Sequence, residues 1–271
     1  MESNPTPETS KLVSILTAAA MAPVTLGKST VLLLPPNYSS KDVTAEMEKA
    51  EPIPFRKKGT VTLISLGALI QYCKDQAAKD SAYIYADPDA TTFTAVFNDQ
   101  RAGQGWRDHR AVFKAEFTPE FKRWLEHSGE KFSQTEFAEF IEDNFADLQG
   151  DDAPLLLKVA TTIASTSGIN FSSARRLHDG QTQLTYNETI NTTAGENGAL
   201  QIPKTFTLGI RIFKNGEGYK LIARLKYRLQ SGLVQFHYEL ERPERAIEDA
   251  FKGYVDKVAT DTEYTVLLGK A

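Results

Sequence analysis

The sequence predicts an α+β protein whose sheets are mainly antiparallel. Segments in which apolar and polar residues alternate recur along the chain, a pattern typical of strands with one buried side. Turn sequences such as Asn215-Gly216 join several of these segments, which favours hairpins. Stretches with helical spacing and capping residues lie between them. We therefore expect an N-terminal β-meander with helices, followed by a C-terminal multi-stranded sheet packed by a helix.

The composition is typical of a soluble globular protein. Of 271 residues, 41% are hydrophobic and 24% are charged, and the net charge is -4. The single cysteine, Cys73, excludes an internal disulfide, and its helical setting favours a buried structural thiol. The N-terminus lacks the basic start of a secretory signal, and Leu12–Ala20 is too short to span a bilayer. We expect a cytoplasmic protein without a membrane partner.

Three parts are expected along the chain. Residues 1–54 form an N-terminal arm with a helix at Thr9–Ala20, an apolar strand at Val31–Leu34 and a polar helical stretch at Ser39–Ala50. Residues 55–150 form an N-terminal α+β part, and residues 151–271 form a C-terminal antiparallel sheet plus helix. Gly150–Pro154 is the best candidate for the boundary between them. The alternative is that these last two parts are one continuous domain.

The second part begins with a strand at Thr60–Ile64 and a helix at Leu66–Ala78. A meander of three strands follows, at Tyr83–Tyr85, Thr91–Phe97 and Arg107–Phe117. Two helices come next. Thr118-Pro119 combines an N-cap residue with a proline at the first helical position, and Ser133–Glu136 is a capping box.

The third part opens with a helix from Pro154 to about Ser165. Two strands near Ile169–Leu177 and Gln181–Ile190 precede a flexible loop at Thr192–Gly198. Three further strands follow, at Thr205–Ile212, Tyr219–Leu229 and Leu233–Leu240. Pro243 opens a final helix, and Thr265–Leu268 closes the chain as a strand.

The strand Tyr219–Leu229 carries opposite chemistry on its two sides. One side is apolar, and the other presents Lys220, Ile222, Arg224, Lys226 and Arg228. Between Lys204 and Arg228 there are seven basic residues and one acid, Glu217. Such a local positive field suits an anionic partner even in a chain of negative net charge.

Charge of the opposite sign lies earlier in the chain. From Glu116 to Asp152 there are eleven acids and three basic residues. Three interpretations of the basic side of this strand follow. It is a solvated surface, or it is a groove that neutralises phosphates. In the third, the acidic helices cover it, either in the same molecule or in a neighbouring copy.

Other motifs carry little chemistry. Gly27-Lys28-Ser29-Thr30 imitates the end of a phosphate-binding loop, but Ala22 stands where that motif needs glycine, and an apolar strand follows instead of a helix. None of the four histidines stands at metal-ligand spacing from another histidine or from the cysteine. No nucleophile is paired with a base. We expect no enzymatic activity, no metal and no small-molecule cofactor.

Several short motifs together resemble a known family. They are Gly105–Ala111, Thr118-Pro119-Glu120, Phe137–Asn144, Ile202-Pro203, Ala223–Arg228 and Arg242-Pro243-Glu244. In combination they resemble the YfdQ-like proteins of tailed bacteriophages and bacterial prophages, over the chain from about residue 55 to the C-terminus. The resemblance implies a phage or prophage origin and a bacterial cytoplasm. It implies no activity and no catalytic residues.

The expected function is that of a non-enzymatic phage accessory protein that self-associates and binds single-stranded nucleic acid. The candidate nucleic-acid-binding residues are the phosphate contacts Lys220, Arg224, Lys226, Arg228 and Arg211, with Trp106, Arg107 and Arg110 as stacking and further basic contacts. One alternative is a structural homo-oligomer, a ring or shell in which the basic side meets the acidic region of a neighbour. Another is an inhibitor or decoy of a host defence protein.

Overall fold

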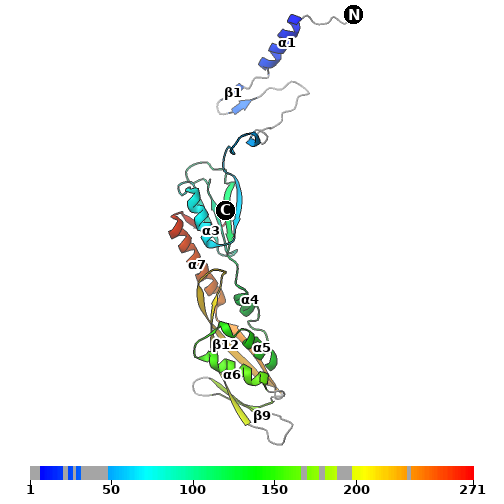
Figure 1. Cartoon of the computed structure of the whole chain (residues 1–271), viewed down its shortest axis with the longest axis vertical. Coiled ribbons are helices and arrows are strands. Elements are labelled where there is room, and N and C mark those ends of the chain that lie inside the picture. Colours follow the sequence, from blue (N-terminus) through cyan, green and yellow to red (C-terminus); the bar gives the residue numbers. More distant parts are fainter. Residues whose placement is uncertain are drawn as a thin grey trace, which may run out of the picture. The chain divides into compact units, whose positions relative to one another are not determined.

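A computed structural model places most of the chain in two compact units, Met1–Lys57 and Lys58–Ala271. It describes residues 7–20, 24–26, 29–31, 48–165, 170–176, 181–187, 197–230 and 233–271 (Figure 1). The expected parts 55–150 and 151–271 both lie in the second unit, apart from residues 55–57. The α+β class with mainly antiparallel sheets is confirmed.

The first unit contains helix α1 (Pro7–Ala20) and the hairpin β1 (Val24–Leu26) to β2 (Ser29–Val31). The large apolar side chains of α1 are all more than half exposed: Leu12, Val13, Ile15 and Leu16. Ser29 and Thr30 lie in a strand, so the apparent phosphate-binding motif does not open a helix there. The remainder of the predicted strand at Val31–Leu34, and most of the helical stretch predicted to end at Ala50, lie outside the described residues.

A five-stranded sheet forms one part of the second unit. Its order is β14 (Val266–Leu268), β4 (Tyr83–Asp87), β5 (Thr92–Val96), β6 (His109–Lys114) and β3 (Gly59–Leu63). The three central strands are the predicted antiparallel meander. Both edge strands are parallel to their neighbours, so this sheet is mixed. The chain therefore returns to its N-terminal sheet at its end, a pairing that the sequence did not indicate.

Two helices cover one side of this sheet. Helix α3 (Leu66–Gln76) starts at Ser65, whose hydroxyl accepts a hydrogen bond from the Ala68 amide, and buries Cys73. Burial raises the pKa of the Cys73 thiol to about 12, as expected for a structural thiol. Helix α7 (Pro243–Thr262) packs beside α3 and places Phe251 4.9 Å from Phe93. The sequence predicted the Pro243 helix against the C-terminal sheet. Helix α7 does contact β12 of that sheet, but it packs more extensively against helix α3.

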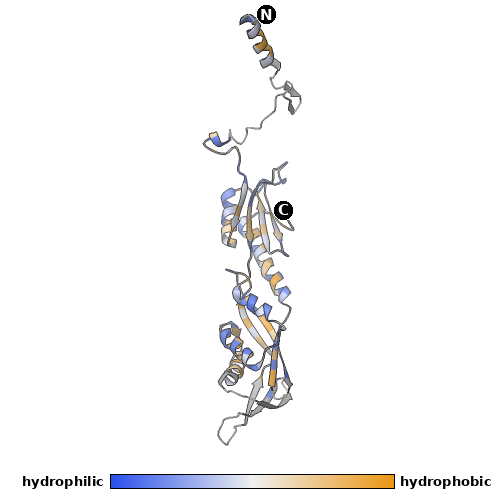
Figure 2. Cartoon of the chain, turned by 90° about the vertical axis from the view of Figure 1, so that its right-hand side faces the viewer, coloured by the Kyte–Doolittle hydropathy of each residue, from blue (hydrophilic) through white to orange (hydrophobic). Residues whose placement is uncertain are grey.

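A four-stranded antiparallel sheet forms the next part. Its order is β13 (Leu233–Leu240), β12 (Gly218–Gln230), β11 (Thr205–Arg211) and β7 (Leu148–Gln149). The alternation of apolar and polar residues along its long strands is visible in Figure 2. The β11–β12 ladder pairs Thr205 with Arg224, and the β12–β13 ladder pairs Arg224 with Glu239. The predicted strands and their two sides are confirmed.

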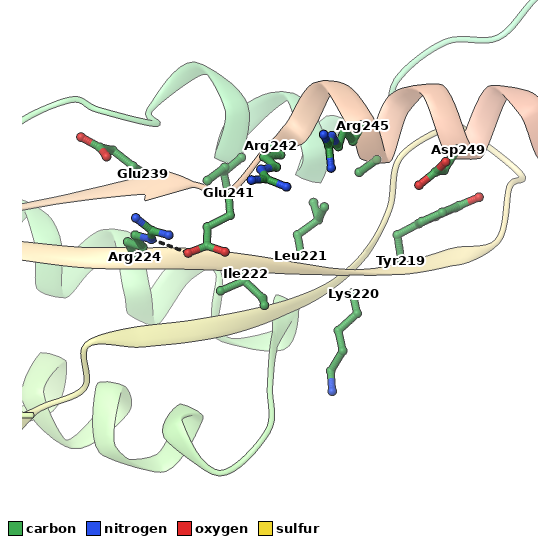
Figure 3. A pocket seen from close by; sticks show the side chains of 12 residues that line it. Tyr219, Lys220, Leu221, Ile222, Arg224, Glu239, Glu241, Arg242, Arg245 and Asp249 are labelled. Carbon is green, nitrogen blue, oxygen red and sulfur yellow. Dashed lines mark hydrogen bonds and ion pairs between the residues drawn. The ribbon is translucent and has the colours of Figure 1, made fainter. Parts of the chain in front are cut away.

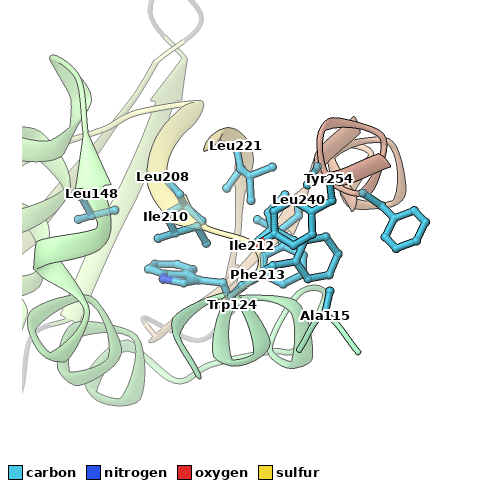
Figure 4. Close-up of a cluster of buried hydrophobic side chains, with 14 of the residues drawn as sticks. Ala115, Trp124, Leu148, Leu208, Ile210, Ile212, Phe213, Leu221, Leu240 and Tyr254 are labelled. Atoms are coloured by element: carbon cyan, nitrogen blue, oxygen red, sulfur yellow. The ribbon is translucent and has the colours of Figure 1, made fainter. Parts of the chain in front are cut away.

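Helices α4 (Pro119–Glu126), α5 (Gln134–Asp143) and α6 (Asp152–Ser165) pack on the apolar side of this sheet. Trp124 is fully buried, with its ring 5.2 Å from that of Tyr238, and Phe137 stacks on Phe236 at 4.6 Å. Figure 4 shows this core from Leu148 past Trp124 to Phe213 and Tyr254. The rings of Phe213 and Tyr254 lie 5.5 Å apart, so the core continues from the four-stranded sheet to α7.

A three-stranded antiparallel sheet completes the described elements. Its order is β10 (Asn197–Ile202), β9 (Thr182–Asn187) and β8 (Asn170–Arg176). Strands β8 and β9 match the predicted positions. Strand β10 was missed, because its first residues were assigned to the flexible loop at Thr192–Gly198.

Candidate functional site

The basic residues of β12 lie on the solvent side of the four-stranded sheet. Lys220, Arg224, Lys226 and Arg228 are exposed, whereas the intervening Leu221, Ala223 and Leu225 are buried. Arg211 at the end of β11 is also exposed and follows Thr205, Thr207 and Gly209 in the same alternation. We call these five exposed cations, Arg211, Lys220, Arg224, Lys226 and Arg228, the basic face.

The acidic helices do not cover the basic face within this molecule. Their apolar residues occupy the other side of the sheet, where Trp124 of α4 lies 5.8 Å from Phe206 and Phe137 of α5 meets Phe236. The interpretation in which α4 and α5 shield the basic residues of their own chain is therefore wrong. The four-stranded sheet instead separates the exposed cations from the acidic helices.

Two of the five cations are neutralised by carboxylates on the neighbouring strand. The Nε atom of Arg224 donates a hydrogen bond to Oε1 of Glu241, and the Nζ atom of Lys226 lies 2.6 Å from Oε1 of Glu239. The hydrogen bond from Lys226 lowers the pKa of Glu239 below its ordinary value. No carboxylate of the described residues forms an ion pair with the other three: Arg211, Lys220 and Arg228.

A groove of about 570 Å³ lies at one end of the basic face. It is bordered by β12, by the end of β13 and by the start of α7, and Figure 3 shows its lining residues. Arg242 and Arg245 contribute two exposed cations to it, and its acids are Glu239, Glu241 and Asp249. Arg242-Pro243 was predicted to start a helix and was not among the candidate binding residues. The basic end of that helix becomes visible as part of a site only when α7 is placed beside β12.

The remaining predicted site residues belong to the other large sheet. Trp106 and Arg107 precede β6, and Arg110 lies on β6, so the structure does not bring them onto the basic face. Trp106 is 77% exposed. The Nε atom of Arg107 lies 3.2 Å from Oδ1 of the buried Asp99, and its guanidinium lies 5.7 Å from the centre of the Tyr85 ring.

Other polar groups have structural surroundings. His109 is buried, and its ring lies 4.8 Å from that of Phe97. Asp87 accepts hydrogen bonds from the amides of Asp89 and Ala90 in the turn between β4 and β5. Across the part of the chain that the structure describes, His, Cys, Asp and Glu side chains form no group of three or more that could hold a metal ion.

The fold defines an α+β protein with a sheet that is cationic on one side and covered by acidic helices on the other. A model of the family of uncharacterised conserved proteins designated DUF2303 matches residues 7–271, and the chain belongs to this family. No curated protein and no solved structure matches the chain. None of the helices in the described segments combines the length and the apolar character that crossing a membrane requires.

Proposed function

We propose that this protein binds single-stranded nucleic acid through the basic face and self-associates, as a non-enzymatic accessory protein of phage or prophage origin in the bacterial cytoplasm. The resemblance to the YfdQ-like proteins supports the origin. One observation carries the binding proposal. Three exposed cations of the basic face have no carboxylate partner among the described residues, and helices α4, α5 and α6 pack on the other side of the sheet.

The dimensions of the basic face suit an extended polyanion. Residues on one side of a strand are about 7 Å apart, so Lys220 and Arg228 are separated by about 27 Å. Arg242 and Arg245 extend the cations into the groove at the start of α7. A single strand of nucleic acid that follows this row of cations would place several phosphates near them. The number of nucleotides covered would be similar to that of a small single-strand-binding surface.

Binding at low salt tests this proposal. We expect a labelled single-stranded oligonucleotide to gain anisotropy with the protein, and to bind much more weakly to the triple variant Arg211→Gln, Lys220→Gln, Arg228→Gln. The matched control removes three exposed lysines near the acidic helices: Lys122→Gln, Lys131→Gln and Lys158→Gln. Because both variants lose the same total charge, equal losses would contradict the basic face as the site. The absence of any binding at low salt would end the proposal.

A second candidate function is that of a structural homo-oligomer. The four-stranded sheet and its helices favour it, because one side of this assembly of elements is basic and the other is acidic. Exposed acids on and beside α4 and α5 include Glu120, Glu126, Glu130, Glu136, Glu139, Glu142 and Asp143. Copies can therefore meet head to tail, with the basic face of one against the acidic helices of the next, an arrangement that builds rings or filaments. Mass photometry distinguishes the candidates. A discrete large particle without oligonucleotide favours the structural assembly, whereas copies that associate only after oligonucleotide is added favour nucleic-acid binding.

A further inference from the structure

The basic face holds cations but no described Trp, Tyr or Phe on its solvent side. The outward residues of β12 and β13 are Lys220, Ile222, Arg224, Lys226, Arg228, Leu233, Gln235, His237 and Glu239. Binding of a single strand usually combines phosphate contacts with stacking of its bases on aromatic rings. Aromatic residues lie instead in and beside the five-stranded sheet: the exposed Trp106 before β6, and the half-buried Tyr83 and Tyr85, which have arginines over their rings.

We propose that Gly105–Arg110, the loop before β6 with the first residues of that strand, forms with Tyr83 and Tyr85 of β4 a separate stacking site for an unpaired nucleobase. This inference rests on the proposed function, because it names the surface that would receive bases of the bound strand. Trp106 supplies the exposed ring, and Arg110 supplies a positive charge, whereas the charge of Arg107 is already paired with Asp99.

The loop is held rigidly although its tryptophan is exposed. A Cβ atom at Gly105 would lie 2.1 Å from the Asn98 carbonyl oxygen, so only glycine fits there. The Arg107 amide donates a hydrogen bond to the Asn98 carbonyl oxygen over 3.1 Å, and the Asn98 side chain donates to Asp108 over 2.8 Å. The backbone on both sides of Trp106 is therefore held in place, which lowers the backbone entropy lost when a ligand stacks on this residue.

The backbone of Arg107 also departs from the ordinary conformations. Its φ angle is 57°, in the left-handed region that non-glycine residues seldom adopt. Such conformations persist where the surroundings enforce them and are concentrated at functional sites. Here the buried Asp99 holds the guanidinium, and Tyr85 donates a hydrogen bond to the same carboxylate over 2.8 Å.

Arginines lie over both tyrosines of β4. The guanidinium of Arg101 lies 5.3 Å from the centre of the Tyr83 ring, and that of Arg107 lies 5.7 Å from the centre of the Tyr85 ring. The Nε atom of Arg110 donates a hydrogen bond to the Arg107 carbonyl oxygen over 2.6 Å, and no carboxylate of the described residues forms an ion pair with Arg110. Arginine planes and aromatic rings both stack on bases, and Arg110 can also attract a phosphate.

A hollow of about 300 Å³ continues this surface. Its lining includes Tyr85, Arg110 and Val112, the threonines Thr60, Thr92 and Thr94, and the ion pair of Asp87 with Lys270, whose Nζ atom lies 3.6 Å from Oδ2 of Asp87. Hydroxyl groups can donate to and accept from the edge of a base, and the tyrosine ring and the arginine plane beside them can stack on its face. The lining therefore offers both kinds of contact that a nucleobase makes.

Tryptophan fluorescence tests the inference. The chain has two tryptophans, and Trp124 is fully buried, so a change on adding ligand reports on Trp106. We expect a single-stranded oligonucleotide to quench the emission, and an abasic oligonucleotide of equal length to leave it unchanged. Trp106→Leu should weaken binding of the ordinary oligonucleotide roughly tenfold, without changing the salt dependence or the binding of the abasic chain. Trp106→Tyr should retain most of the affinity.

Three outcomes would overturn the inference: an oligonucleotide that binds without quenching, equal quenching by the abasic chain, or an emission that changes with protein concentration alone, which would place Trp106 in a contact between copies. Failure of the basic face as the phosphate site gives a different result. In that case the triple variant of the basic face would bind as tightly as the unmodified protein, whereas Trp106→Leu would still bind more weakly. The absence of any oligonucleotide binding would overturn both the proposed function and this inference.

Discussion

The Nζ atom of Lys226 lies 2.6 Å from the Oε1 atom of Glu239 on the adjacent strand. Lys226 is directly opposite His237 in the ladder, so this ion pair runs diagonally across β12 and β13. A phosphate that approaches Lys226 must therefore compete with a carboxylate that is already in place. The same holds for Arg224 and Glu241, which leaves Arg211, Lys220 and Arg228 as the cations best placed to bind an anion.

Replacing Glu239 should strengthen binding. The Glu239→Gln substitution releases Lys226 and removes a negative charge from the basic face, so we expect severalfold tighter oligonucleotide binding and a salt slope steeper by about 0.7. Anisotropy titrations at several salt concentrations measure both quantities. Glu126→Gln, an exposed acid on α4, is the control with the same charge change. A gain of equal size in the control would show that only total charge matters.

The capping box of α5 should make stability depend on pH. The Ser133 amide donates a hydrogen bond to Glu136 over 2.8 Å and lowers the pKa of that carboxylate below its ordinary value. Because the folded-state pKa is the lower one, the unfolded chain binds more protons. The stabilisation is complete above the ordinary pKa and is lost as the pH falls through the folded-state value. Urea unfolding at a series of acidic pH values should show a smaller loss in Glu136→Gln than in the unmodified protein; identical pH profiles would be inconsistent with this role.

The two tryptophans should differ sharply in their contribution to stability. Trp124 is fully buried, and its indole N–H donates a hydrogen bond to Asp147 over 2.8 Å, so Trp124→Ala should cost about 3–5 kcal/mol of unfolding free energy. Trp106→Ala at the exposed position should cost less than about 0.5 kcal/mol. Urea denaturation followed by circular dichroism gives both values. A large loss from Trp106→Ala would mean that this side chain is part of the fold.

Substituting alanine for two different glycines should change the stability in opposite directions. Gly105→Ala would force the backbone away from Asn98 and should lower the melting temperature while altering the Trp106 emission. Gly67→Ala, near the start of α3, meets no atom within 4 Å and should stabilise the protein by up to about 1 kcal/mol. Thermal melts of both variants test this prediction. If Gly105→Ala were as stable as the unmodified chain, the loop would not be as tightly packed as the structure indicates.

Local features of the chain predicted much of the fold. The alternation in Tyr219–Leu229 correctly separated exposed cations from buried apolar residues, because strand geometry alone decides this pattern. The Ser133–Glu136 capping box and the Thr118-Pro119 helix start likewise depend on residues within one helical turn. Each of these signals involves near neighbours in sequence.

Contacts between distant segments were not predictable in the same way. Strand β14 pairs with β4 across about two-thirds of the chain, and no local pattern in Val266–Leu268 identifies that partner. Glu239 and Glu241 neutralise cations of β12 only because the register of the β12–β13 ladder brings them together. For the same reason, Trp106 and Arg110 appeared to belong with the basic strand, although they lie on a different sheet.

The salt dependence of oligonucleotide binding tests the central claim most directly. If Arg211, Lys220 and Arg228 each contact a phosphate, the slope of log affinity against log salt should become shallower by about 2 in the triple glutamine variant. The slope should be unchanged in the control that lacks Lys122, Lys131 and Lys158. Equal slopes for the unmodified protein and the triple glutamine variant would contradict phosphate binding at the basic face.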